Sequence, residues 1–66
     1  MIIVSRLKVI LVERRIKFGE FAKDVGISQA ALSTLMNKED ALPTLRVAYR
    51  IAEALDLSVE EIWQKK

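Results

Sequence analysis

The chain lacks cysteine and histidine altogether, and its 66 residues include one proline and two glycines. Without cysteine there is neither a disulfide framework nor a thiolate metal site, and without histidine the commonest zinc ligand and general base are missing. A small fold held together by metal or disulfides is therefore excluded, and we expect no cofactor. So few glycines and prolines leave no flexible linker, and we expect one domain over residues 1–66.

Long hydrophobic runs are missing too. Apolar residues make up 52% of the chain but occur in groups of one to four, whereas a membrane span needs about 20 in succession. The apolar start, residues 1–4, has no basic region before it and no small-residue cleavage site after it, so it does not resemble a secretory signal. We expect a cytoplasmic protein with no membrane partner.

The spacing of the apolar residues predicts a first helix over residues 5–15 and a second that stops at Gly26. The apolar face of the first consists of Val4, Leu7, Ile10 and Leu11, widened by Val9 and Val12. The second has the full amphipathic spacing in Phe18, Phe21, Ala22 and Val25. We expect the large apolar side chains to form the core, namely Phe18, Phe21, Leu32, Leu35, Ile51, Leu55 and Trp63.

Three further helices are predicted to begin at hydroxyl residues suited to helix capping. Ser28 opens a helix that ends near Asn37, after which residues 37–40 form a polar loop. Thr44 opens a fourth helix, which buries Ala48, Ile51, Ala52 and Leu55. Ser58 and Glu61 fit the capping box of a short fifth helix.

Residues 1–4 fit the helical pattern poorly and are also compatible with a short strand. An isolated apolar strand needs a partner edge, most simply the same strand of a second subunit. We expect a dimer surface formed by residues 1–4 and by the last helix around Ile62 and Trp63.

Charge is distributed unevenly along the chain. Residues 1–23 hold six basic and two acidic residues, whereas the four charges of residues 53–63 are all acidic. No acidic residue lies between Asp24 and Glu39. A segment free of negative charge can approach phosphates without repulsion.

The junction between the second and third predicted helices carries the clearest motif. Two helices that cross steeply over a short turn need a small side chain at their closest approach, which Ala22 supplies. Gly26 tolerates the positive φ that such a turn requires, and Ile27 anchors the turn in the core. This is the pattern of a helix-turn-helix.

Residues 21–33, FAKDVGISQAALS, resemble the L-A-x-x-x-G-(V/I)-S-x-x-x-(I/L)-S core of the Cro and cI-type helix-turn-helix regulators, the xenobiotic-response-element family. Residues 51–58, IAEALDLS, are similar to that family's fourth-helix ending. The resemblance covers residues 6–63. It implies an all-α, five-helix, lambda-repressor-like domain of bacterial, phage or plasmid origin.

The resemblance also implies a double-stranded DNA partner, with the helix that starts at Ser28 in the major groove. Gln29 and Ala30 correspond to base-reading positions, and Ser33 lies one turn further along the same face. The DNA-binding residues implied are Lys17, Ser28, Gln29, Ala30, Ser33, Thr34, Asn37, Lys38 and Arg46. The sequence departs from the family at Lys17 and Phe18, where Thr and Gln are frequent, and at Lys38, where Gly is usual.

The function we expect is that of a transcriptional repressor that binds a palindromic operator as a homodimer. A solvated helix face would account equally well for Gln29, Ser33 and Thr34 taken singly. An enzyme is not expected, because the adjacent pairs Glu39-Asp40 and Glu60-Glu61 have diverging side chains, and no glycine-rich phosphate loop or small-molecule site is evident. An antitoxin or protein-interaction adaptor is the alternative, although only residues 64–66 follow the last predicted helix and an antitoxin usually has a longer tail.

Overall fold

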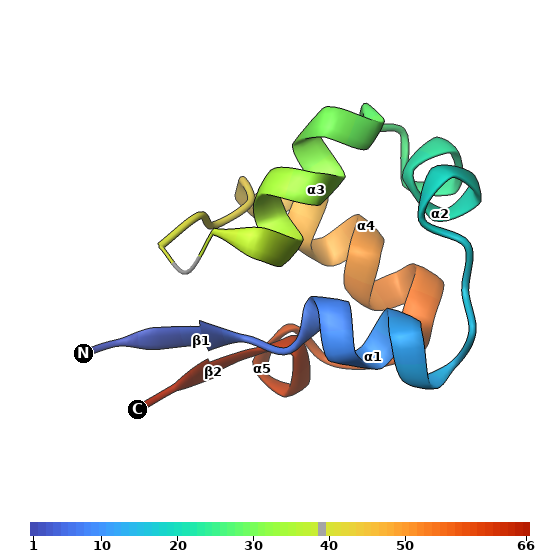
Figure 1. Ribbon diagram of the computed structural model, residues 1–66. Coiled ribbons are helices and arrows are strands. Elements are labelled where there is room, and N and C mark those ends of the chain that lie inside the picture. The colour runs from blue at the N-terminus through green and yellow to red at the C-terminus, as the bar shows by residue number, and fades with distance from the viewer. Residues whose placement is uncertain (39) are drawn as a thin grey trace.

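The computed structural model describes residues 1–38 and 40–66, which form five helices and a two-stranded sheet (Figure 1). In chain order the elements are β1 (Ile3–Ser5), α1 (Leu7–Glu13), α2 (Phe18–Val25), α3 (Gln29–Asn37), α4 (Leu45–Leu55), α5 (Val59–Ile62) and β2 (Trp63–Lys65). The all-α class expected from the sequence is confirmed. None of the helices in these residues has the length and apolar character that crossing a membrane requires.

The predicted capping residues begin the helices as expected. Ser28 Oγ and Thr44 Oγ1 each accept a hydrogen bond from the backbone N–H three residues on, at 3.0 and 3.3 Å. Ser58 and Glu61 form both bonds of the capping box. By contrast, the N-cap of α2 is Lys17, whose side chain makes no capping hydrogen bond. The predicted loop after Asn37 includes Glu39, which lies outside the described residues. The expectation that the side chains of the neighbours Glu39 and Asp40 diverge therefore lies outside them too.

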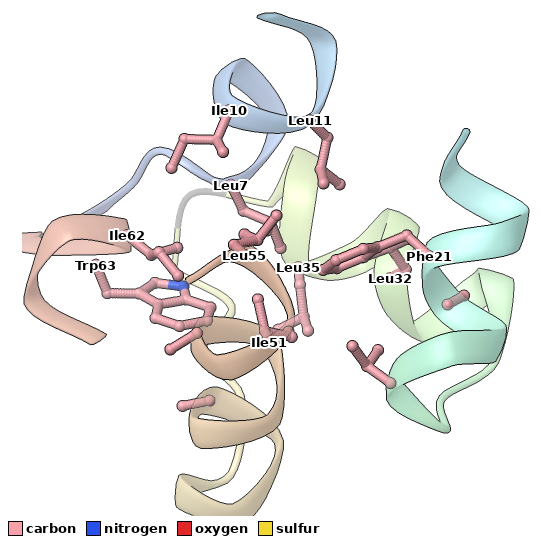
Figure 2. Close-up of a cluster of buried hydrophobic side chains, with 14 residues drawn as sticks. Leu7, Ile10, Leu11, Phe21, Leu32, Leu35, Ile51, Leu55, Ile62 and Trp63 are labelled. Atoms are coloured by element: carbon pink, nitrogen blue, oxygen red, sulfur yellow. The ribbon is translucent and has the colours of Figure 1, made fainter. Parts of the chain in front are cut away.

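The core joins all five helices, with α4 at its centre (Figure 2). Leu7 and Leu11 of α1, Ile51 and Leu55 of α4, and Ile62 of α5 are inaccessible or nearly so. The predicted core residues are buried with one exception. Phe18 is 38% exposed; it is the first residue of α2 and lines a surface groove instead of entering the core.

The first helix is shorter than predicted, and its apolar face is narrower. Val4 belongs to β1, so the inward face of α1 consists of Leu7, Ile10 and Leu11, while Val9 and Val12 are exposed. The helix ends before Arg15, which has a positive φ of 56°. The pairing of β1 explains the late start, because it holds residues 3–5 in an extended conformation.

The strand predicted near the N-terminus exists, but its partner is the chain's own C-terminus. β1 pairs antiparallel with β2, with Val4 opposite Gln64 (Figure 1). Backbone bonds in both directions between Ile2 and Lys66, at 3.1 and 2.7 Å, extend the pairing. β1 therefore has a partner strand within the chain and does not need a second subunit to supply one. Of the expected dimer surface, Ile62 and Trp63 are only 0% and 7% exposed in the single chain, whereas Met1 and Ile2 are 92% and 68% exposed.

Candidate nucleic-acid interface

A turn centred on Gly26 fixes α3 against α2. Gly26 ends α2 in the left-handed conformation, with φ 77° and ψ 33°. The N–H of Gly26 donates to Lys23 O at 3.2 Å, and that of Ile27 donates to Ala22 O at 2.9 Å. These two bonds satisfy carbonyls that the end of a helix would otherwise leave free. Ala22 is buried under the junction, so the helix-turn-helix predicted from the sequence is present.

The two sides of α3 differ in character. Leu32 and Leu35 are buried in the core, and Met36 packs partly against it. The outward side is exposed and carries no charged residue within the helix. Its members are Gln29, Ala30, Ser33, Thr34 and Asn37. Because these side chains are uncharged, they can approach the edges of base pairs without electrostatic repulsion from the phosphates.

Hydrogen bonds set the polarity of the outward side of α3. Thr34 Oγ1 donates to Ala30 O at 3.0 Å, which leaves the hydroxyl oxygen of Thr34 as an acceptor. Asn37 Nδ2 donates to Ser33 Oγ at 3.1 Å, which leaves the hydroxyl proton of Ser33 free to donate. Lys8 Nζ in turn donates to Asn37 Oδ1 at 3.2 Å. Neighbouring positions on this side therefore offer opposite hydrogen-bonding groups.

The structure brings together only some of the site residues predicted from the sequence. Gln29, Ser33 and Asn37 line one groove beside α2. Ser28 is the N-cap of α3, and its hydroxyl oxygen is engaged by the helix. The three predicted basic site residues lie in three separate places: Lys17 precedes α2, Lys38 follows α3, and Arg46 lies in the first turn of α4.

Two residues that the sequence analysis did not single out complete the groove. Lys8 reaches it from α1 and Gly19 from the first turn of α2. No sequence signal identifies Lys8, because its contact with Asn37 spans 29 positions. Gly19 has a recognisable signal, since glycine within a helix is unfavourable compared with alanine and indicates a close approach. No acidic residue is among those that line this groove.

The tightly turned α2–α3 pair and the exposed, uncharged side of α3 define a class of protein, the lambda-repressor-like helix-turn-helix DNA-binding domains. The family described as the Cro/C1-type HTH DNA-binding domain matches residues 6–64 of the chain. The chain belongs to this family, as the resemblance predicted. No curated protein matches the sequence.

Proposed function

We propose that the chain is a sequence-specific transcriptional regulator that binds a palindromic operator as a homodimer and represses transcription by occupying the promoter. The observation that carries the proposal is the outward side of α3, exposed and uncharged in a domain of a DNA-binding family. In the major groove this side meets base edges, where sequence can be distinguished.

Each position on this side suits a different base contact. The Gln29 amide has the donor and acceptor needed for a bidentate contact with adenine N6 and N7, and the Ala30 methyl suits the methyl group of thymine. Ser33, with a free hydroxyl proton, suits acceptors such as guanine O6 or N7. Thr34 offers an acceptor to exocyclic amines.

The remaining predicted residues suit the DNA backbone. Lys17, Lys38 and Arg46 are exposed, and basic side chains neutralise phosphates without reading sequence. Asn37 is held by Lys8 at the end of the same groove. The acidic residues of the C-terminal part of the chain lie on α4, on α5 and in the turn between them, and none of them belongs to α3.

A second exposed apolar surface, besides the one expected at residues 1–4, supports the homodimer. Leu42, Leu45 and Tyr49 expose 54%, 68% and 61% of their surface. Together they present on the order of 400 Å², comparable to patches that are often functional and about half of what one partner buries in a standard interface. Leu42 and Leu45 line a groove formed by apolar residue types, together with Ile3, Pro43, Ala48, Val59 and Trp63. Tyr49 follows Leu45 by one turn of α4.

Symmetry gives the dimer its role in recognition. A two-fold pairing of this apolar face with the same face of a second copy is self-complementary. Two copies of α3 about 34 Å apart would then read successive major grooves of one operator. Steric exclusion of the transcription machinery from the occupied promoter is the resulting mechanism of repression.

Selection of binding sites from random double-stranded DNA tests the proposal, with the affinity of the selected duplex measured over a range of salt concentrations. We expect a two-fold-symmetric consensus bound at least a thousandfold more tightly than random duplex, about the lower bound for specific binders. Weak binding abolished by salt, without a consensus, would contradict the proposal and favour an antitoxin or adaptor.

Sedimentation of the wild type and of Leu45→Glu tests the dimer surface. We expect the substitution to weaken self-association and cooperative operator binding without lowering thermal stability, because Leu45 is exposed in the single chain. Arg46→Ala, one residue further on and also exposed, is the matched control. It should weaken DNA binding but leave self-association unchanged.

A further inference from the structure

Gly19 occupies a position where its own backbone does not require glycine. It is the second residue of α2, and Gly26 is the glycine with a positive φ. Alanine would adopt the same helical conformation and would favour the helix. The reason for glycine must therefore lie in what surrounds the position.

The space next to Gly19 is filled by Gln29 from the start of α3. A Cβ built on Gly19 would overlap Gln29 Nε2 and would lie 3.5 Å from Gln29 Cδ. The amide end of Gln29 thus rests where a side chain of α2 would otherwise be. α2 and α3 contact each other and are joined by the short turn at Gly26 (Figure 1). Lys8, Phe18, Leu32, Ser33, Met36 and Asn37 line the rest of the groove.

We propose that Gly19 is a specificity-determining residue of the DNA contact, because its missing side chain provides a seat that sets the position of the Gln29 amide. The inference rests on the proposed function and adds how one base contact is controlled. Glutamine is long and flexible, and a bidentate contact with adenine requires its amide to be well placed. A side chain held beforehand loses less freedom when it binds. A methyl group at position 19 displaces the amide from its seat.

Gly19→Ala tests this directly in the full chain, beside Gln29→Ala and the double variant. The affinity of each is measured for the selected duplex and for duplexes with one base pair changed at a time. We expect Gly19→Ala to keep or raise the Tm and to lose about tenfold discrimination at the base pair where Gln29→Ala also loses it. On the Gln29→Ala background it should cause no further loss, because the two residues act as one unit.

Ala54→Gly is the matched control. Ala54 is exposed on α4, outside the groove that Gln29 lines. Replacing it by glycine makes the opposite change in helix propensity to Gly19→Ala, at a position outside the proposed seat. The Tm should fall while discrimination at every base pair remains within twofold of the wild type.

The seat can also be detected without DNA, as a nuclear Overhauser effect between the Gln29 side-chain amide and the Gly19 Hα protons in the free chain. Its absence would overturn the inference and leave the proposed function untouched. The inference would also be overturned if Gly19→Ala discriminated between duplexes as well as the wild type does. The same holds if Gly19→Ala lowered discrimination by as much on the Gln29→Ala background as it does alone. A wild-type chain that selects no consensus would overturn the proposed function, and this inference with it.

Discussion

Helices α3 and α4 begin alike but differ in what they bury. Each follows an extended residue whose hydroxyl group caps it, Ser28 for α3 and Thr44 for α4. Of its eleven residues α4 buries four, on a face that meets the rest of the core, whereas α3 buries two of nine. The comparison shows that α4 contributes more side chains to the core than α3 does. We therefore assign α4 the role of scaffold, and the exposed side of α3 the proposed role of recognition. Substitutions should separate the two roles.

Ile51→Ala should have the largest effect. Ile51 is inaccessible at the centre of α4, and deleting such a side chain costs about 2 to 5 kcal/mol. A domain this small has little stability to lose, so urea denaturation should show a population unfolded before denaturant is added. DNA binding should fall only in proportion to the folded fraction. If the free energy of unfolding of Ile51→Ala equalled that of the wild type, α4 would not be the scaffold of the domain.

Gln29→Ala should show the opposite behaviour on α3. Gln29 is exposed, so the urea midpoint should stay close to that of the wild type. Affinity should fall by about 1 to 3 kcal/mol for duplexes with the preferred base pair at one position, with specificity relaxed there. A uniform loss across all sequences would mean that Gln29 does not read a base.

The two N-caps offer a matched pair. Ser28→Ala and Thr44→Ala each remove one capping bond, and each should cost about 0.5 to 2 kcal/mol in urea denaturation. Only Ser28→Ala should weaken operator binding beyond its effect on stability, because it loosens the end of α3 that we propose meets DNA. Equal binding by the two variants would show that the start of α3 is not in contact.

Lys38→Ala should have the smallest effect. Lys38 is exposed at the end of α3, so the stability of the fold should not change. Binding to every sequence should weaken equally, and the slope of log affinity against log salt concentration should become shallower by about 0.9 for one lost phosphate contact. An unchanged slope would place Lys38 outside the contact.

The starts of α3, α4 and α5 were predictable because their causes are local. Ser28, Thr44 and Ser58 each cap a helix through a bond to a residue three positions away, and Gly26 ends α2 through its own backbone conformation. The same local regularity, with apolar residues spaced by three and four, identified the buried residues of α4. The family resemblance depended in part on the same positions, because Gly26, Ser28 and Ser58 belong to the motifs that carry it.

Tertiary packing decided the features that were predicted wrongly or missed. Periodicity assigned Val4, Val9, Val12 and Phe18 to buried faces, but whether a face is buried depends on what packs against it. The pairing of β1 with β2 joins the two ends of the chain, which no local pattern encodes.

The sequence by itself therefore determined the starts of α3, α4 and α5 and the turn at Gly26, because each depends on residues within about four positions of one another. It also determined the family, because the two motifs that carry the resemblance can be read from the sequence directly. The tertiary structure alone decided how the terminal strands pair, which apolar residues stay exposed, and how Lys8 and Gly19 meet the outward side of α3. These features depend on residues distant in sequence, and their contacts exist only once the helices have packed around α4.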